Sequence, residues 1–562
     1  MSVSSLPFLH GALAAVLPKL AAWRRDFHAH PEAGWTEFRT AALIIRRLRE
    51  LGYAIRMGEA ACASDRRMGV PSSAVLAAAR ERALEHGADA ELVAGMGDGY
   101  TGFWADLDCG PGPVTAFRFD MDCNEVAECA EESHRPVREG FASRWPGLMH
   151  ACGHDGHAAV GLGLAEVLVS IRRHLRGRIR LIFQPAEEGA RGALPMSEAG
   201  AVDGVDVLFG FHIGFKAEGP GSLICGTQGF LATTKRDVLF SGVPAHAGAA
   251  PEEGKDALLA ACSAVVNLHA ISRNGKGGTR IAVGRLEGGE ARNVIPASAR
   301  LFMETRGETT VLDAYMTAES ERILRASADL WGCACEWRTV GNSAGGGSSP
   351  ELARLIATVA EAMGGWKTVI PMSGFGATED FACLMSRVQA SGGLASYLQV
   401  GTDRAAGHHS DRFDFDETCL GRALELLARL AVRMAGGGQE DTETETESDM
   451  EFLDEVVRRK GIHVQLWLEG EDGEGFGRGR VELLQLVDEL GSLSKAAKQL
   501  GMSYRGAWGK IKKAERIAGE TLVDASGTKR DGYSLTPAGR ELVQRFQQWY
   551  ADVESFAKKR AE

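Results

Sequence analysis

The chain has 562 residues, of which 44% are hydrophobic, and a formal net charge of −12. This length is too great for one domain, so three or more packed units are expected. The acidic balance excludes a protein that coats nucleic acid along its whole length, and no apolar run is long enough to span a bilayer.

The N-terminal segment lacks a basic stretch ahead of an apolar core, and Pro18 and Lys19 interrupt its only apolar run. This pattern predicts an amphipathic helix and not a signal peptide. The eleven cysteines are scattered and odd in number, which favours reduced thiols over disulfides. We therefore expect a cytoplasmic protein with no membrane partner.

The first 57 residues predict two helices, with a break at Pro31 and a second helix that opens near Thr36. His28 and His30 lie beside that break. A histidine next to a turn more often caps or packs than binds metal, so we assign both a structural role. Residues 58–98 are rich in alanine and predict a helical insertion on the surface.

Two apolar strands follow, and the second ends in three carboxylates, Asp120, Asp122 and Glu125. Open α/β sheets place their chemistry at the carboxyl ends of buried strands. These carboxylates are therefore candidates for a site, although capping of a loop explains this segment equally well on its own.

The stretch from Met149 to His157, MHACGHDGH, gathers histidine, cysteine and aspartate side chains and leads into an apolar helical run. Imidazole nitrogen and thiolate sulfur are the ligands that zinc and similar divalent metals favour. A loop that enters a helix can aim alternate residues at one point. The plain alternative is a histidine-rich surface loop that binds nothing, because short metal-like motifs also arise by chance.

Further along, the β-rich run RIRLIF stops at Pro185, and Glu187 and Glu188 follow at once. Adjacent carboxylates at a strand end can divide their work, with one binding metal and the other moving protons. The next apolar strand, VDVLFGFHIG, is expected to end on His212. The alternation of strands and helices predicts an α/β fold with a mostly parallel sheet between layers of helices.

Residues 227–341 follow the order strand–helix–strand–strand–helix–strand, which predicts a ferredoxin-like domain inserted into a sheet domain of residues 1–226 and 342–436. Residues 437–455 are acidic and repetitive and predict a disordered linker. Residues 456–562 carry 19 Lys and Arg against 15 Asp and Glu, and they predict a winged helix–turn–helix.

The candidate metal ligands are far apart in the sequence but occupy equivalent places, at strand ends and in the loops after them. They are Cys152, His154, Glu188, His212 and either His408 or His409. A set of this kind suffices for two metal ions with a shared ligand or water, and such pairs activate water for hydrolysis. Glu187, beside Glu188, is in place to act as the base.

These motifs together resemble the two-metal aminoacylase and carboxypeptidase amidohydrolases, and within that family the branch that hydrolyses p-aminobenzoyl-glutamate. The resemblance covers residues 20–436 and rests on MDCNEV, HACGHDGH, FQPAEEGARGA, GFHIG, PAHAG, ARNVIP, GATEDF and GHHSDRFDFDE. It implies an amidohydrolase that cleaves the amide bond of an N-acyl or N-aroyl amino acid. It also implies two divalent metal ions, zinc or manganese, as cofactors.

Motif by motif, the resemblance implies roles for individual residues. The implied metal ligands are Cys152, His154, Glu188, His212 and His409. His409 is preferred to His408 because the ligand histidine of the family directly precedes the serine or asparagine of its motif. Glu187 is implied as the general base, and Asp122 as a carboxylate that orients the metal site.

The inserted domain is implied to be a lid and a dimerisation domain. His246 matches a lid histidine that reaches the scissile carbonyl, often in the partner subunit's site. Arg292, Asn293 and Arg306 are candidates for binding the substrate carboxylate, and surface polar groups are the alternative reading. The protein is thus expected to be a homodimer or a heteromer with a related subunit.

Residues 461–545, from IHVQLWLEG to LTPAGREL, resemble the N-terminal winged helix–turn–helix of molybdate-responsive transcription regulators. Such a domain places its second helix in the major groove of DNA and its wing on the backbone. The implied DNA-binding residues are Tyr504, Arg505, Lys510, Lys529 and Arg530. Contact with protein instead of DNA is the alternative, because the excess of positive charge is small.

The sequence therefore predicts an amidohydrolase with a tethered DNA-binding domain. The alternative is a transcription regulator that uses a hydrolase-like domain as a metabolite sensor. An intact base argues against a purely sensory role, since a sensor does not need one. A peptidase that acts on dipeptides would share the site and differ only in its pocket.

Overall fold

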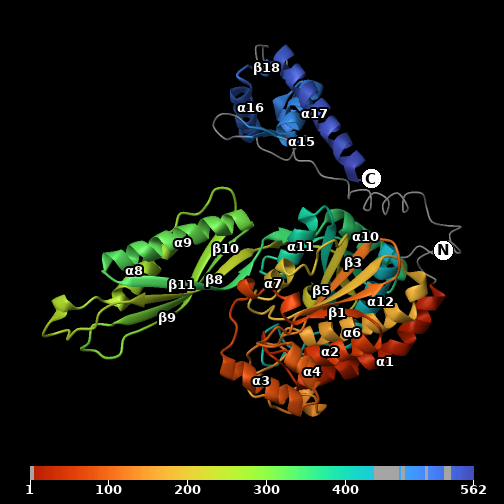
Figure 1. Cartoon of the computed structure of the whole chain (residues 1–562), viewed down its shortest axis with the longest axis vertical. Coiled ribbons are helices and arrows are strands. Elements are labelled where there is room, and N and C mark those ends of the chain that lie inside the picture. The colour runs from red at the N-terminus through yellow and green to blue at the C-terminus, as the bar shows by residue number, and fades with distance from the viewer. Residues whose placement is uncertain (1–5, 436–466, 470–474, 500–503, 525–532, 562) are drawn as a thin grey trace. The chain divides into compact units, whose positions relative to one another are not determined.

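The computed structural model describes residues 6–435, 467–469, 475–499, 504–524 and 533–561 (Figure 1). The chain divides into two compact units, Met1–Val457 and Arg458–Glu562. The predicted acidic linker, residues 437–455, lies outside the described residues. In the described part of the chain, no helix combines the length and the apolar character that crossing a membrane requires.

An eight-stranded sheet forms the centre of the first unit, in the order β1-β2-β4-β3-β5-β15-β6-β13. Its strands are β1 (Ala54–Met57), β2 (Phe103–Asp108), β3 (Val114–Asp120), β4 (Arg178–Gln184), β5 (Val207–Glu218), β6 (Ser222–Ile224), β13 (Thr368–Ile370) and β15 (Leu394–Thr402). The four central strands β4, β3, β5 and β15 are parallel, as predicted, whereas β2 runs antiparallel to β4 at one side. The carboxyl ends of these four strands therefore meet at one edge.

Apolar cores lie on both faces of this sheet, because successive side chains of a strand point in opposite directions. Phe117 and Phe119 of β3 belong to the larger core, and Ala116 belongs to the smaller one. The helices that contribute to the larger core include α1 (Pro7–Ala29), α2 (Phe38–Glu50), α6 (His154–Ser170), α10 (Pro350–Met363) and α12 (Thr418–Ala435). The helices of the smaller core are α7 (Ala193–Glu198) and α11 (Phe381–Ala390).

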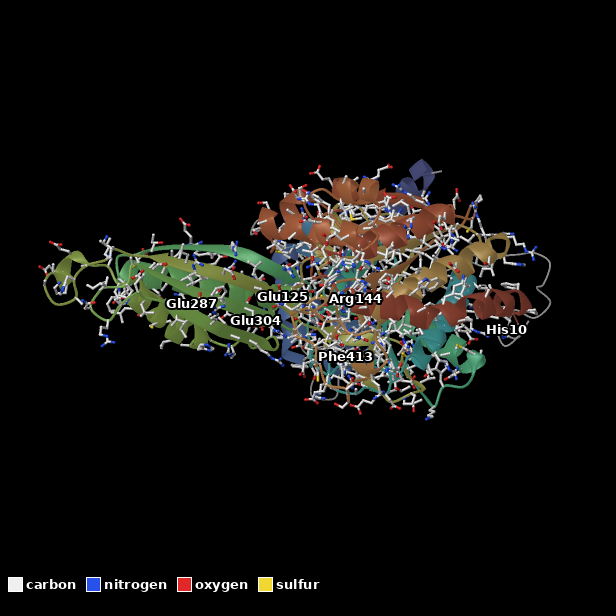
Figure 2. The ribbon with its side chains drawn as sticks, turned by 90° about the horizontal axis from the view of Figure 1, so that it is seen from below. His10, Glu125, Arg144, Glu287, Glu304 and Phe413 are labelled. Atoms are coloured by element: carbon white, nitrogen blue, oxygen red, sulfur yellow. The ribbon has the colours of Figure 1, made fainter. Side chains whose placement is uncertain are left out.

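The inserted domain forms a lobe with its own apolar core (Figures 1 and 2). Its elements are β8 (Ala232–Ser241), α8 (Ala257–His269), β9 (Thr279–Gly288), β10 (Ser298–Gly307), α9 (Thr310–Leu330) and β11 (Ala334–Ser343). The four strands form an antiparallel sheet in the order β11-β8-β10-β9. At the base of the lobe, β7 (Thr227–Phe230) pairs with β12 (Gly346–Gly347), so the entering and leaving chains are joined.

The second unit contains the predicted helix–turn–helix around a core of its own. Its elements are β16 (Trp467–Glu469), β17 (Gly475–Gly477), α14 (Arg478–Leu490), α15 (Leu493–Gln499), α16 (Tyr504–Ala518), β18 (Val523–Asp524), β19 (Ser534–Leu535) and α17 (Pro537–Ala561). The pairing of β18 with β19 forms the base of the predicted wing. The residues between these two strands, 525–532, lie outside the described part of the chain.

The structure corrects two expectations in the first unit and confirms a third. Residues 54–57 form strand β1, because Gly52, at φ 85°, follows the end of α2 and lets the chain turn to pair with β2 as the edge strand of the sheet. The segment 58–98 is helical, as predicted, and contains two helices, α3 (Ser73–Glu85) and α4 (Ala90–Gly95), after short 3-10 turns. Strand β5 does not end on His212 but continues to Glu218, alongside β15.

A buried guanidinium connects the first helix to the helix that carries the Cys-His motif. Arg24 of α1 is completely buried. Its side chain donates to Asp155 at 2.8 Å, to Asp414 at 2.8 Å and to Glu417 at 3.3 Å. Asp155 is the second residue of α6, so this network fixes the start of α6 against α1 and the segment before α12.

Replacement of Arg24 by Met is expected to destabilise the protein by about 3–5 kcal/mol, because it leaves the fully buried carboxylate of Asp155 without its guanidinium partner. Replacement of its neighbour Arg25, whose side chain is 35% exposed and pairs with Glu417, is expected to cost no more than about 1 kcal/mol. Denaturant unfolding of both variants and the wild type measures the difference. Equal losses of stability would contradict the role given to Arg24.

Candidate active site

The Cys-His motif lies where the chain turns into α6. Gly153 is the N-cap of the helix and has a left-handed φ of 96°, and Cys152 and His154 flank it. The backbone N–H of Ala151 donates to the side chain of Asn124 at 3.1 Å, and its carbonyl accepts from the backbone N–H of His409 at 2.8 Å. The loop is therefore tied both to the end of β3 and to the His408–His409 segment.

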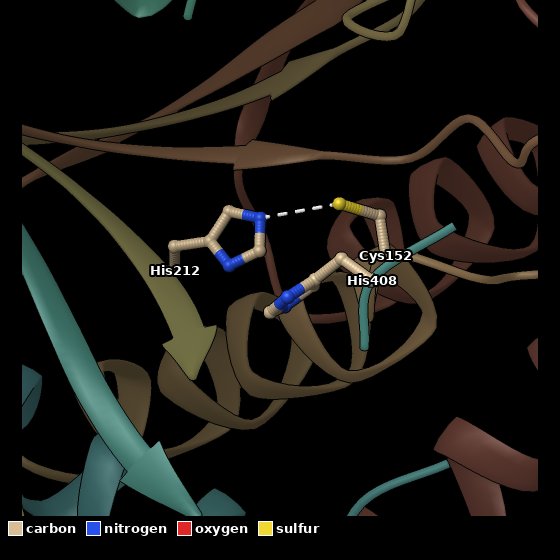
Figure 3. A group of neighbouring side chains, drawn as sticks. All are labelled: Cys152, His212 and His408. Atoms are coloured by element: carbon tan, nitrogen blue, oxygen red, sulfur yellow. Dashed lines mark hydrogen bonds between the residues drawn. The ribbon is translucent and has the colours of Figure 1, made fainter. Parts of the chain in front are cut away.

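Backbone carbonyls orient two of the histidines. Nδ1 of His154 donates to the carbonyl of Asp122 at 2.8 Å, and Nδ1 of His212 donates to the carbonyl of Ile213 at 2.8 Å. A carbonyl can only accept, so each Nε2 is left with its lone pair. Nε2 of His154 is buried without a hydrogen-bond partner, and Nε2 of His212 lies 3.4 Å from Sγ of Cys152 (Figure 3). Both nitrogens are thus prepared to bind a cation.

Carboxylates hold the loop after β4. The two oxygens of Asp122 accept from the backbone N–H groups of Glu187 and Glu188, each at 3.0 Å. Glu37 accepts from the N–H of Ala186 at 2.9 Å, at a left-handed residue with φ 52°. The side chains of Glu187 and Glu188 consequently turn towards His154, with carboxylate oxygens 3.9 and 4.0 Å from its Nε2.

The structure distinguishes His409 from His408. Nδ1 of His408 accepts from Arg404 at 2.8 Å, and its Nε2 donates to the carbonyl of Ile213 at 3.2 Å, so both nitrogens are occupied. Nε2 of His409 instead lies 3.3 Å from a carboxylate oxygen of Glu188. His409 also has a left-handed φ of 65°, a strained conformation that is typical of functional sites. These contacts favour His409 as the ligand, although His408 lies close to Cys152 and His212 (Figure 3).

Both ring nitrogens of His157 have protein partners, which favours a structural role for it, although its ring lies close to His154 and Asp120. Its Nδ1 lies 2.5 Å from a carboxylate oxygen of Asp120, and its Nε2 accepts from the N–H of Ile213 at 3.0 Å. Asp120 is also paired with the buried guanidinium of Arg118. His28 is likewise structural, as predicted, because its two nitrogens contact Asp155 and Glu128.

The environments of Glu187 and Glu188 push their pKa values in opposite directions. Burial and the neighbouring carboxylates of Glu379 and Glu188 raise the pKa of Glu187 well above its ordinary value. Burial opposes ionisation of Glu188 too, but the hydrogen bond from His409 lowers its pKa to about 2. A pair of carboxyl groups with separated pKa values is the usual arrangement of a proton-transfer site.

The donor set fits divalent metal ions. Two groups of side chains, Cys152–Glu188–His409 and His154–Glu187–Glu188, each have ligand atoms within 4.8 Å of one another. Glu188 belongs to both groups, and one of its oxygens is buried without a partner, as is Nε2 of His154. Unpaired buried polar atoms each cost about 1–3 kcal/mol, and a cation between them would remove that cost.

The predicted lid residues lie on the inserted domain. His246 is exposed, and its Nδ1 accepts from the backbone N–H groups of Gly248 and Ala249, so Nε2 carries the proton. The His246 loop is hydrogen-bonded to the loop that contains Arg292 and Asn293, which are also exposed. Within the described residues, no hydrogen bond or ion pair joins these side chains to the candidate ligands.

Arg306 lies apart from the loop that contains His246. It belongs to strand β10, and its Nε donates to Glu304 of the same strand at 2.7 Å. Its charge is therefore already paired on the inserted domain.

Asp380 and Glu379, which lie beside the loop after β4, were not identified from the sequence. Asp380 accepts from the backbone N–H groups of Gly192 and Ala193 at 3.1 and 3.0 Å. Its neighbour Glu379 pairs with Arg118 at 3.0 Å. The motif GATEDF contains both carboxylates, but nothing in its local pattern indicates that they approach Glu187.

Of the predicted DNA-binding residues, two have described side chains. Tyr504 and Lys510 are exposed on α16, and the hydroxyl of Tyr504 lies 2.8 Å from that of Tyr533 beside the wing. The side chain of Arg505, and all of Lys529 and Arg530, lie outside the described part of the structure.

Two known families match separate parts of the chain. Residues 116–433 match Peptidase family M20/M25/M40. Residues 479–540 match the family described as bacterial regulatory helix-turn-helix protein, lysR family. This second match confirms the predicted helix–turn–helix, whereas the resemblance to molybdate-responsive regulators stays a prediction.

Among curated relatives, one subunit of p-aminobenzoyl-glutamate hydrolase from Escherichia coli (strain K12) is 46% identical over 420 residues, which cover 74% of this chain and 96% of that protein. Indole-3-acetyl-aspartic acid hydrolase of Enterobacter agglomerans is 44% identical over 429 residues, 76% of this chain and 98% of that protein. About a quarter of this chain therefore lies outside each match.

Solved structures of related proteins match a similar share of this chain. An aminobenzoyl-glutamate utilization protein from Klebsiella pneumoniae is 40% identical, with a TM-score of 0.66, over 75% of this chain and 98% of that one. The Bacillus subtilis YXEP protein, described as a dinuclear metal binding peptidase from M20 family, is 25% identical, with a TM-score of 0.51, over 75% of this chain and 98% of that one. The chain therefore belongs to Peptidase family M20/M25/M40, as a metal-dependent hydrolase with a helix–turn–helix unit at its C-terminal end.

Proposed function

We propose that the protein hydrolyses the amide bond between an aromatic or other acyl group and an acidic amino acid, as in p-aminobenzoyl-glutamate. One observation carries this proposal: Glu187 and Glu188, with pKa values shifted in opposite directions, face the unpaired Nε2 of His154. The names of the two curated relatives support the substrate class, since each contains an aromatic acyl group joined to glutamate or aspartate.

Two divalent metal ions, zinc or manganese, fit the donor set of the site. The residues proposed to hold them are Cys152, His154, Glu188, His212 and His409. When bound, such ions polarise the amide carbonyl and lower the pKa of a coordinated water to about 7. The Bacillus subtilis relative described as dinuclear supports a pair of ions.

Glu187 is the proposed proton carrier. Its carboxylate is held beside the ligand set by the N–H bond to Asp122, and burial strengthens its affinity for a proton. One of its oxygens can therefore accept the proton of the attacking water and deliver it to the leaving nitrogen. Asp122 acts through this bond and through the carbonyl that orients His154.

The inserted domain is proposed to contribute substrate-binding side chains to the site. With Nδ1 occupied by two backbone donors, His246 presents Nε2–H as a donor for the substrate carbonyl oxygen. Arg292 and Asn293, on the neighbouring loop, and Arg306 are proposed to bind the α-carboxylate. We further propose that this domain closes over a site with the help of a second copy or a related protein. The name of the Escherichia coli relative, which describes one subunit of a hydrolase, supports this assembly.

Replacement of Glu187 by Gln is expected to lower kcat by about 10²–10⁴ while bound metal is retained, because only the proton carrier is lost. The matched variant, Glu188→Gln, is expected to lose metal as well as activity. Metal analysis and release of p-aminobenzoate from p-aminobenzoyl-glutamate measure both. A fully active Glu187→Gln protein would contradict the proposal.

The two adjacent histidines provide a second test. Replacement of His409 by Gln is expected to weaken metal binding, because its Nε2 lies 3.3 Å from a carboxylate oxygen of Glu188, another candidate ligand. Replacement of His408 by Gln is expected to retain metal, because both of its nitrogens already have protein partners. Competition with a chelator ranks the two affinities, and the reverse order would show that the ligand assignment is wrong.

A second function, regulation of transcription with the hydrolase-like part as a metabolite sensor, is supported by the helix–turn–helix match at residues 479–540. Proposed DNA contacts are Tyr504, Arg505, Lys510, Lys529 and Arg530. Enzyme activity and DNA binding are compatible in one chain, so the two proposals do not exclude each other.

Replacement of Lys510, which is exposed on α16, by Ala is expected to weaken DNA binding and to reduce the slope of log affinity against log salt by about one. The reason is the loss of one phosphate contact. Titration of the full-length protein with duplex DNA at several salt concentrations gives the slope. DNA affinity that does not change with salt would favour a protein-binding role for this unit.

A further inference from the structure

A cavity of about 690 Å³ opens beside the candidate ligands Glu188 and His409. Its volume is in the range of small-molecule sites. Apolar side chains of α3, among them Val75 and Ala79, line one part of it, and polar residues at the end of β3 line another. A substrate whose amide bond lies at the ligand set therefore has room for a side group in this cavity.

Arg191 is the cation of this cavity that lies nearest in sequence to the ligands, three residues after Glu188 in the same loop. One of its Nη atoms donates to the carbonyl of Gly69 at 3.1 Å, while its Nε is buried without a hydrogen-bond partner. Among the described residues, no carboxylate forms an ion pair with it. The guanidinium is thus held by one hydrogen bond from Nη1, and its other N–H groups remain available as donors.

Close packing by glycines holds this guanidinium in place. A Cβ atom on Gly69 would lie 2.8 Å from Cδ of Arg191, and one on Gly34 would lie 2.8 Å from its Nη2. Side chains at these two positions would therefore displace Arg191. The side chain of Arg191 thus packs closely against the backbone at both glycines, and no carboxylate of the described residues forms an ion pair with it.

Two other arginines, one of this cavity and one of the inserted domain, differ from Arg191. Arg82 also lines the cavity, but its guanidinium lies over the ring of Trp145, 5.2 Å from the centroid. Arg306 of the inserted domain is paired with Glu304. Arg191 thus combines a fixed position next to the ligands with open donors, which is what recognition of a substrate carboxylate requires.

We propose that Arg191 determines specificity by binding the side-chain carboxylate of the substrate's acidic amino acid in this cavity. The inference rests on the proposed amidohydrolase function and adds the residue that selects the amino-acid side chain. It differs from the lid residues, which are assigned to the α-carboxylate.

The test compares two substrates of equal shape, p-aminobenzoyl-glutamate and p-aminobenzoyl-glutamine, on the full-length, metal-loaded protein. Because the two differ only in the side-chain charge, the ratio of their kcat/KM values reports recognition of that charge. The same pair with an indole-3-acetyl group checks that the ratio does not depend on the acyl half. The ratio is internal to each preparation, so partial misfolding of a variant does not change it.

The wild type is expected to prefer glutamate, and Arg191→Met is expected to lower kcat/KM for glutamate by about 10- to 100-fold, mainly through KM, with little change for glutamine. Arg191→Lys keeps the charge but loses the planar guanidinium. Its kcat/KM for the glutamate substrate is expected to lie between those of the wild type and Arg191→Met. Arg173→Met, at an exposed arginine of a 3-10 turn outside this cavity, is the control and is expected to keep the wild-type ratio.

The outcomes separate this inference from the proposed function. If the wild type prefers glutamate and Arg191→Met keeps that preference, the assignment of Arg191 is wrong while the amidohydrolase function stands. A wild type that does not distinguish glutamate from glutamine also overturns the assignment. If the metal-loaded wild type cleaves no amide of the panel, the proposed function fails and the role of Arg191 falls with it.

Discussion

The site depends on one constraint, the bond of the buried carboxylate of Asp122 to two consecutive backbone amides. By accepting from Glu187 and Glu188, Asp122 ties the end of β3 to the end of the neighbouring parallel strand β4. Its own carbonyl accepts from Nδ1 of His154 and aims that ring at the same place. One residue therefore sets the positions of the proposed base Glu187, the candidate ligand carboxylate Glu188 and the candidate ligand imidazole of His154.

Buried charge is concentrated around this constraint and is compensated from several directions. Arg118 neutralises Asp120 and Glu379 on one side, and Arg24 neutralises Asp155 on the other. Such groups cannot be removed singly without leaving a charge in an apolar core. The scaffold is thus rigid, which is the condition for holding catalytic groups in a fixed geometry, while the inserted domain supplies exposed groups on a separate lobe.

Much of this arrangement could be predicted from the sequence, because strand ends in a parallel sheet converge. The residues Cys152, His154, Glu188 and His212 were expected at such ends, and the structure brings their side chains together. The roles of Glu37 and Asp380 could not be predicted, since they act on backbone amides distant in sequence. The continuation of β5 past His212 was also missed, because the strand is sustained by pairing with β15, which lies nearly 190 residues later in the chain.

The most direct test of the ligand assignment is to locate bound metal in crystals of the protein by anomalous scattering. We expect two ions, held by Cys152, His154, Glu188, His212 and His409, with Glu187 beside them but not required as a ligand. Coordination by His157 or His408, or a single ion away from Glu188, would contradict this assignment.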